Sequence, residues 1–126
     1  MTALILDAGA LIAVDRGERR MQRKIGDALR MGDPVRTNAN AVAQVWRDGA
    51  KQARLARLLR DVKIEPITAE NGYRAGELLG TTRTKDVVDA TVALLVKSGD
   101  ELYTSDMGDL RELCEATGFK AVVIAC

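Results

Sequence analysis

The chain has 126 residues, of which 47% are hydrophobic and 29% are charged, and its formal net charge is +1. This composition is typical of a folded globular protein, and no apolar run approaches the ~20 residues that span a bilayer. The chain has no histidine and only two cysteines, which excludes Ser-His and Cys-His catalysis, histidine-bound zinc and a disulfide scaffold. We expect a single domain over residues 1–126, without a signal peptide and in the cytoplasm.

Five short segments are typical of strands, and the third of them, VKIE, is expected to be exposed. In chain order they cover residues 2–6, 34–37, 62–65, 101–104 and 120–125. Apolar residues at helical spacing predict helices between them, over residues 8–14, 17–31, 38–46, 50–60, 68–79, 86–97 and 107–116. The alternation predicts an α/β fold with a central parallel sheet of four to five short strands flanked by helices. Val87, in the sixth helix, is expected to face the core.

The carboxylate of Asp7 interrupts the apolar segment ALILDAGALIAV, residues 3–14. An ionised carboxylate is costly to desolvate unless a partner offsets its charge. Ligand sites of parallel sheets form beyond the carboxyl ends of the strands, and Asp7 and Asp106 each follow a predicted strand. Asp7 is therefore expected at the rim of the sheet, where it faces other polar groups or a cation.

Two pairs of acids, each three residues apart, begin two further predicted helices, and two hydroxyl groups precede the second pair. They are Asp86 with Asp89, Asp106 with Asp109, and Thr104 with Ser105. Residues three apart lie on one side of a helix, although an acid at a helix start also suits N-capping. Acids that meet at one rim repel one another unless a divalent cation offsets their charge, and oxygen ligands favour Mg²⁺ or Mn²⁺. A metal site formed by Asp7, Asp89 and Asp106 is therefore predicted.

Four segments of the chain resemble, in order, those of PIN-domain ribonucleases, specifically the VapC-type toxins of bacterial VapBC toxin–antitoxin systems. They are LILDAGALIA, AVAQVWRDG, DVVDATVALL and LYTSDMGDL. The resemblance covers nearly the whole chain and implies a PIN-like fold that uses Mg²⁺ or Mn²⁺ to hydrolyse RNA endonucleolytically. It also implies a homodimer and neutralisation by a cognate VapB-type antitoxin.

The resemblance further implies roles for single residues. The catalytic and metal-binding acids of the family fall on Asp7, Asp89 and Asp106. Supporting positions fall on Asp86, Asp109, Gln44, Thr104 and Ser105, the two hydroxyls as contacts of a phosphate or a carboxylate. Many family members have Glu where this chain has Gln44. An amide adds no negative charge, so weaker metal binding is expected here.

Two groups of basic residues suit contact with RNA phosphates. The group predicted to bind RNA contains Arg47, Lys51, Arg54 and Arg57, and the other contains Arg16, Arg19, Arg20, Arg23 and Lys24. A solvated helix face, or contact with an acidic antitoxin segment, explains either group as well. Because aromatic residues make up only 3% of the chain, base stacking is expected to be minor. Trp46 is expected in the core or in a dimer interface.

Three alternatives belong to other classes of protein. Gln44 is compatible with a catalytically weakened PIN-like module that binds RNA or protein. A phospho-receiver-like signalling domain also has an acid after its first strand, but it needs an Asp after a middle strand, and residues 34–46 contain no Asp or Glu. A dehalogenase-like phosphatase needs a second Asp at position 9, where this chain has glycine.

Overall fold

The computed structural model describes residues 2–126. These residues form the strands β1 (Leu4–Leu6), β2 (Val35–Asn38), β3 (Lys63–Glu65), β4 (Glu101–Thr104) and β5 (Val122–Ala125). The helices are α1 (Ala8–Asp15), α2 (Arg19–Arg30), α3 (Ala39–Val45), α4 (Ala53–Asp61), α5 (Ala69–Thr81), α6 (Val87–Ala93) and α7 (Met107–Thr117). Each predicted strand and helix is present, with its bounds shifted by a few residues. Across residues 2–126, no helix combines the length and apolar character needed to cross a membrane.

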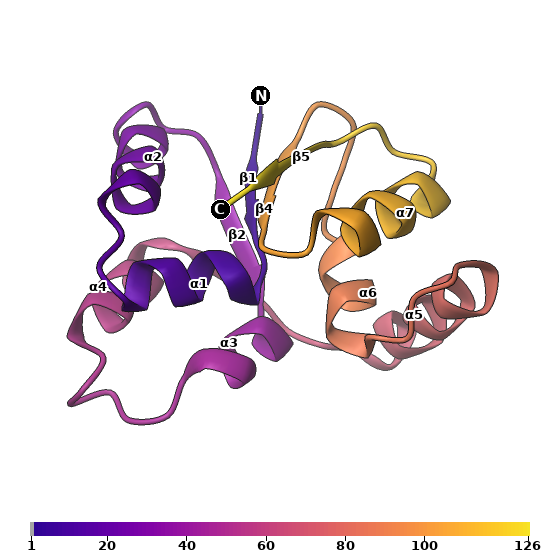
Figure 1. The fold of residues 1–126 in the computed structure, drawn as a ribbon, viewed down its shortest axis with the longest axis horizontal. Coiled ribbons are helices and arrows are strands. Elements are labelled where there is room, and N and C mark those ends of the chain that lie inside the picture. The colour runs from indigo at the N-terminus through magenta and orange to yellow at the C-terminus, as the bar shows by residue number, and fades with distance from the viewer. Residues whose placement is uncertain (1) are drawn as a thin grey trace.

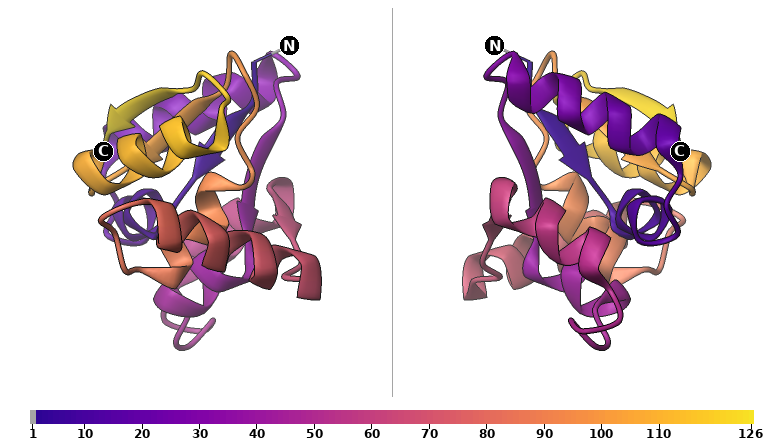
Figure 2. Two further views of the ribbon diagram at one scale, coloured as in Figure 1. Left: turned by 90° about the vertical axis from the view of Figure 1, so that its right-hand side faces the viewer. Right: turned by 90° about the vertical axis from the view of Figure 1, so that its left-hand side faces the viewer.

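The five strands form one parallel sheet in the order β3-β2-β1-β4-β5. α1, α2 and α4 lie on one side of the sheet, and α5, α6 and α7 lie on the other (Figure 1). Figure 2 shows this layered arrangement from its two sides. The predicted α/β fold with a central parallel sheet is confirmed. The strand order excludes the phospho-receiver alternative, because a receiver sheet has the order 2-1-3-4-5.

The strand order reverses between β1 and β4, which lie side by side at the centre of the sheet. After β1 the chain continues into α1 on one side, and after β4 it continues into α7 on the other (Figure 1). The two connections leave the sheet on opposite sides, and we call the place between them, at the carboxyl ends of β1 and β4, the crevice. Open α/β sheets bind their ligands at such a topological switch point.

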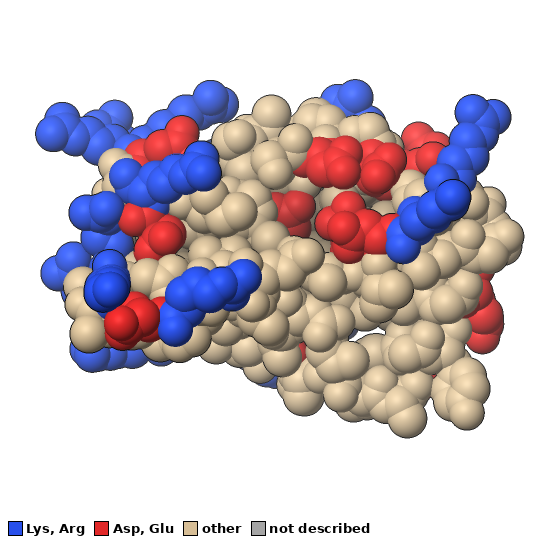
Figure 3. All heavy atoms as spheres, turned by 60° about the horizontal axis from the view of Figure 1, so that its bottom comes forward, with Lys and Arg blue, Asp and Glu red and all other residues tan. Residues whose placement is uncertain are grey.

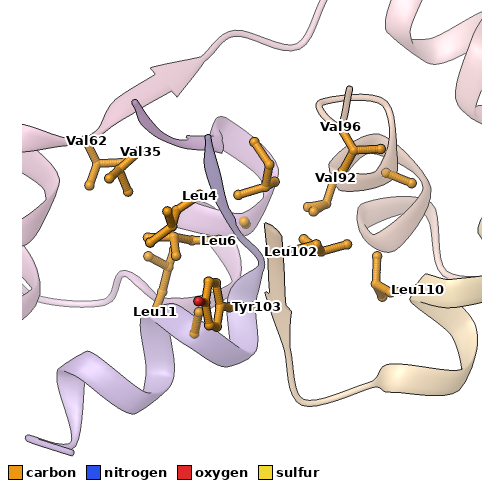
Figure 4. Packing of buried hydrophobic residues seen from close by; sticks show 14 of the residues in the cluster. Leu4, Leu6, Leu11, Val35, Val62, Val92, Val96, Leu102, Tyr103 and Leu110 are labelled. Carbon is orange, nitrogen blue, oxygen red and sulfur yellow. The ribbon is translucent and has the colours of Figure 1, made fainter. Parts of the chain in front are cut away.

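The core occupies both faces of the sheet, which explains why β1, LIL, is wholly apolar and why Leu102 and Tyr103 of β4 are buried. Leu4 and Leu6 lie on the α1 side near Leu11, whereas Leu102 lies on the other side and faces Val92 of α6 (Figure 4). These five side chains are at most 3% exposed. Burial on both faces fixes the positions of β1 and β4, and with them the two sides of the crevice.

α6 ends at Ala93, four residues before the predicted end of this helix. The reason is a contact that the local sequence does not reveal. The carboxylate of Asp100, which is buried, accepts hydrogen bonds from the backbone N–H groups of Lys97 at 2.9 Å and Ala3 at 3.1 Å. Gly99, with φ of 90°, supplies the left-handed turn between them. The chain therefore leaves the helix early and enters β4 beside β1.

Two side chains are more exposed than predicted. Val87 is 57% exposed, because it occupies the first turn of α6 at the rim of the sheet and not a core-facing position. Trp46 is 38% exposed, so its predicted place in the core is wrong. Its ring lies over Gly49, where an added Cβ would stand 2.8 Å from the ring. The glycine therefore allows the tryptophan to fold back onto the loop that follows α3.

Candidate metal centre

Asp7 lies at the carboxyl end of β1, as predicted, and is buried there with an exposure of only 4%. Its Oδ1 accepts a hydrogen bond from the backbone N–H of Ala10 at 3.3 Å, which makes Asp7 the N-cap of α1. Its Oδ2 accepts a hydrogen bond from the hydroxyl of Thr104 on β4. Burial raises the pKa of Asp7, although both hydrogen bonds oppose this change. The carboxylate is thus held in one orientation at the edge of the crevice.

Thr104 links the two sides of the crevice through one buried hydroxyl. Its Oγ1 donates to Asp7 and accepts the backbone N–H of Asp106 at 2.9 Å. The predicted contact of Thr104 with a carboxylate is therefore present. Ser105, the other predicted hydroxyl, is exposed.

The acids of the last two helices act as caps and also approach one another. Asp86 caps α6 by accepting the backbone N–H of Asp89 at 3.0 Å, and Asp106 caps α7 by accepting that of Asp109 at 3.5 Å. The capping interpretation is therefore correct for Asp86 and Asp106. Carboxylate oxygens of Asp89, Asp106 and Asp109 lie within 4.8 Å of one another. This group differs from the predicted one, because Asp109 belongs to it and Asp7 lies beside it.

The acids at the crevice repel one another strongly. The pKa of Asp89 is raised to about 7, first by burial and then by four neighbouring carboxylates, those of Asp86, Asp7, Asp106 and Asp109. Asp106 is the main cause of the raised pKa of Asp109. Within residues 2–126, none of these five acids forms a salt bridge. A set of converging, uncompensated oxygen ligands fits a hard divalent cation such as Mg²⁺ or Mn²⁺.

Gly9 sets the distance between the two connections that leave the sheet. A Cβ at this position would lie 2.4 Å from Oγ and 2.8 Å from the backbone nitrogen of Ser105. Only glycine allows the start of α1 to approach the loop before α7 so closely. The sequence analysis missed this role, although a glycine inside the helix-forming segment AGALIAV was the available signal.

A polar junction joins the end of β2 to α6. Asn38 caps α3 by accepting the backbone N–H of Ala41 at 2.9 Å. The side-chain amides of Asn38 and Asn40 also donate to Oγ1 of Thr91, at 3.2 Å and 3.3 Å. Thr91 donates in turn to the carbonyl of Val88 at 2.8 Å. The junction holds α6, which carries Asp89, against the sheet.

Gln44 lies on α3 and is exposed. α3 packs against α1, which follows Asp7, and against α6, which carries Asp89. The helix therefore lies beside the crevice. A contact between the Gln44 side chain and a bound metal stays a prediction.

Two of the four arginine and lysine residues predicted to bind RNA have partners within the protein. The Arg47 guanidinium donates to the carbonyls of Ala43 at 3.0 Å and Trp46 at 2.7 Å, at the end of α3. The Arg54 guanidinium donates to the carbonyl of Asp15 at 2.9 Å, at the end of α1. Cations suit the ends of helices, where carbonyls lack partners. Both arginines therefore have a structural role that the sequence did not reveal.

Basic side chains are unevenly spread over one face of the molecule. Lysines and arginines gather mainly at the left of Figure 3, on the side of α1, α2 and α4, with acids among them, whereas acids predominate at the centre and right. Lys51 and Arg57, the other two residues predicted to bind RNA, are exposed. An anionic chain that crosses this face would meet the cations on one side of the acids.

Comparison of the sequence with protein-family models and with curated proteins gives no match. Comparison with solved structures shows similarity to a chain in the crystal structure of VapBC2 from Rickettsia felis bound to a DNA fragment from their promoter. The two chains are 10% identical with a TM-score of 0.69, and the similarity covers 100% of this chain and 99% of that one. At this identity the comparison concerns the fold alone, and it shows that the chain has a PIN-like fold.

The hydroxyl of Thr104 can be tested with two matched substitutions. Thr104→Val keeps the shape of the side chain but removes the hydroxyl, which leaves a carboxylate oxygen of Asp7 and the N–H of Asp106 without this partner. The free energy of unfolding should therefore fall by about 1–3 kcal/mol. Thr104→Ser keeps the hydroxyl and should cost clearly less. Urea unfolding measures both changes. Equal losses in the two variants would show that the methyl group matters and the hydrogen bonds do not.

The raised pKa of Asp89 predicts how stability depends on pH. In the unfolded chain this group titrates near 3.8, and in the folded protein near 7. Between these values the folded state holds a proton that the unfolded state has released, so the free energy of unfolding contributed by Asp89 falls as pH rises from about 4 to about 7. In the absence of divalent cations, Asp89→Asn should therefore stabilise the protein at pH 8 by about 1–2 kcal/mol, a figure reduced for solvent screening.

Urea unfolding at pH 4.5 and pH 8 in a chelator measures this effect. Glu77→Gln, which removes an exposed acid from α5, is the matched control and should leave the pH dependence unchanged. At pH 4.5, Asp89→Asn should differ little from the original protein. A stabilisation of the same size at both pH values would contradict the assigned pKa.

Proposed function

We propose that this protein is a Mg²⁺- or Mn²⁺-dependent endoribonuclease and the toxin of a type II toxin–antitoxin system. The observation that carries the proposal is the convergence of Asp7, Asp89, Asp106 and Asp109 at the switch point of a PIN-like sheet. The similarity in fold to a chain of the VapBC2 complex supports it. A cognate VapB-type antitoxin, an RNA substrate and a homodimer belong to the same proposal.

The residues of the crevice would have separate roles in phosphodiester hydrolysis. A bound Mg²⁺ or Mn²⁺ lowers the pKa of a water molecule and offsets negative charge on the scissile phosphate. Asp7, Asp89 and Asp106 would hold the cation. Because the chain has no histidine, a carboxylate must accept the proton of the attacking water. We assign this role to Asp109, since carboxylate oxygens of Asp109, Asp89 and Asp106 lie within 4.8 Å of one another and a water held beside them is within its reach.

The hydroxyl and basic groups around the crevice would position the RNA. Ser105 is exposed next to Asp106, so its hydroxyl is available to a phosphate oxygen. Lys51 and Arg57 are the stronger candidates for backbone phosphates, because Arg47 and Arg54 already donate to carbonyls of the protein. Such contacts recognise the backbone and shape of RNA and not its bases.

A second candidate function is a PIN-like module that binds RNA or protein without cleaving it. Gln44 favours this alternative, because an amide supplies one negative charge less than the glutamate that many PIN-domain toxins have. A cleavage assay separates the two functions, since a binding module would retain RNA without shortening it.

Metal-dependent cleavage is the first test of the proposal. The purified protein should shorten a mixed RNA substrate in Mg²⁺ or Mn²⁺, and EDTA should stop the reaction. Asp7→Asn should reduce cleavage by at least about 100-fold, because it removes a metal-binding charge while asparagine can still cap α1. Gel analysis of the RNA measures both effects, and circular dichroism confirms that the variant folds.

Glu77→Gln is again the matched control, and it should cleave RNA as the original protein does. An antitoxin encoded beside the gene should bind the protein and suppress cleavage when the two are co-expressed. Full cleavage in EDTA would refute the metal-dependent mechanism. Retention of intact RNA under every metal condition would favour the binding module.

Gln44→Glu tests the role of the position on α3. If Gln44 faces the cation, an added carboxylate should lower the Mg²⁺ or Mn²⁺ concentration needed for half-maximal cleavage, by about tenfold at most. The maximal rate need not rise, because tighter binding of the metal in the ground state does not lower the chemical barrier. A metal titration of RNA cleavage by both proteins measures the effect. Superimposable titration curves would place Gln44 outside the metal site.

A further inference from the structure

A cavity of about 480 Å³ lies between the first half of α2 and the edge strand β5. Its apolar surface includes Met21 of α2, Tyr103 of β4 and Ile124 of β5. The register of the sheet pairs Tyr103 with Ile124, so their side chains lie on the same face. This part of the sheet is therefore left open between α2 and the strand edge.

The rim of the cavity carries more positive than negative charge. Four exposed cations, Arg19, Arg20, Arg23 and Lys24, face only two acids, Glu18 and Asp27. In the part of the chain covered by residues 2–126, none of the four cations forms a salt bridge. An anionic partner would therefore find unpaired positive charges along this rim.

The position of these cations in α2 is unfavourable for the helix itself. The N-terminal end of a helix is electropositive and is stabilised by acids. The first turn of α2 has no acid, and its N-cap, Glu18, makes no capping hydrogen bond with its side chain. Residues that break a local rule in this way are expected at functional sites. Glu18 at the N-cap is the one acid beside the first turn of α2, so the cations of this turn outnumber the acids there.

β5 presents a free strand edge next to the same cavity. The backbone N–H of Val122 donates to the carbonyl of Asp100, just before β4, at 2.9 Å, and that of Cys126 donates to the carbonyl of Thr104 on β4 at 3.0 Å. In a parallel strand, the backbone N–H and C=O groups of alternate residues point to opposite edges of the strand. Those of Val123 and Ala125 therefore point away from β4. The strand itself has neither a charged residue nor a proline to block further pairing.

From these three features we infer that β5 and the start of α2 form a docking surface for an extended, acidic segment of another protein. The segment adds to β5 as a sixth strand, and its backbone pairs with the free groups of Val123 and Ala125. Side chains on one face of the added strand point toward α2, where apolar ones enter the cavity and acidic ones face the cations of its rim. The inference does not depend on nuclease activity, because it uses none of the acids at the crevice.

RNA and a second copy of the chain fit this surface less well. Tyr103 is only 4% exposed, so the cavity offers no aromatic face on which a base could stack. A second β5 could pair with the edge, but Val122–Ala125 carries no acid to face the cations. An acidic peptide strand meets both the backbone groups and the charges.

Fluorescence anisotropy tests the inference with a labelled peptide of about eight residues, in which valine and glutamate share the face that points toward α2 and threonine fills the other face. The peptide should bind the full chain, and a peptide with lysine in place of glutamate should not. The same acidic peptide with N-methyl groups on alternate residues, which cannot pair along a strand edge, should not bind either. A labelled single-stranded oligouridylate of similar charge should bind more weakly than the acidic peptide.

Matched variants locate the binding surface. Combining Arg20→Glu with Lys24→Glu should weaken peptide binding by about tenfold or more, whereas Arg74→Glu with Arg83→Glu, on the other side of the sheet, should change it little. Val123→Pro removes the free N–H and should abolish binding, and Val123→Thr should preserve it. Circular dichroism verifies that each variant folds.

Four results would overturn the inference: no binding of the acidic peptide, equal binding of the lysine peptide, unchanged binding by Val123→Pro, or tighter binding of the oligouridylate. Association of the protein with itself that Val123→Pro abolishes would assign the edge to a second copy instead. Because the readout is peptide binding, failure here leaves the RNA-cleavage results unaffected.

Discussion

The hydroxyl of Thr104 forms the contact on which the geometry of the crevice depends. It donates to the carboxylate that follows β1 and accepts the backbone N–H that follows β4, so one buried group fixes both sides. Without such a link, the repulsion between Asp7 and the acids of α6 and α7 would favour a wider crevice. The repulsion remains visible in the raised pKa of Asp89. The fold therefore holds together charges that would separate in solution, which is the condition that a tightly bound cation requires.

The layers of the fold could be predicted from the sequence, because strands that are buried on both faces are rich in apolar residues. LIL in β1 and the Leu-Tyr pair of β4 stand in short segments between helical patterns, and this alternation implies a parallel sheet. The end of α6 could not be predicted in the same way. It depends on Asp100 accepting a hydrogen bond from Ala3, 97 residues away in the sequence. Contacts between distant residues leave no local pattern.

In the candidate site too, features set by the local sequence could be predicted, and contacts between separate elements could not. Asp7, Asp89 and Asp106 could be found because each stands at the end of a predicted strand or in the first turn of a predicted helix. The approach of Gly9 to Ser105 and the bonds of Asn38 to Thr91 could not be found, because each joins separate elements. Arg47 and Arg54, whose contact with RNA stays a prediction, also have a structural role that the sequence did not reveal. Their spacing resembles a nucleic-acid surface, yet their guanidinium groups donate to helix carbonyls.

Two regions of this chain carry charge that the fold alone does not need, and β4 connects them. The crevice gathers acids that raise one another's pKa values, and α2 begins with cations where its dipole favours anions. Tyr103 lines the cavity beside α2, and the next residue, Thr104, holds Asp7. Cys126, which follows β5, donates its backbone N–H to the carbonyl of Thr104. A strand added along β5 would therefore be separated from Thr104, the residue that orients Asp7, by β5 alone. Partner binding at β5 and the geometry of the acids both depend on the backbone of β4 and β5.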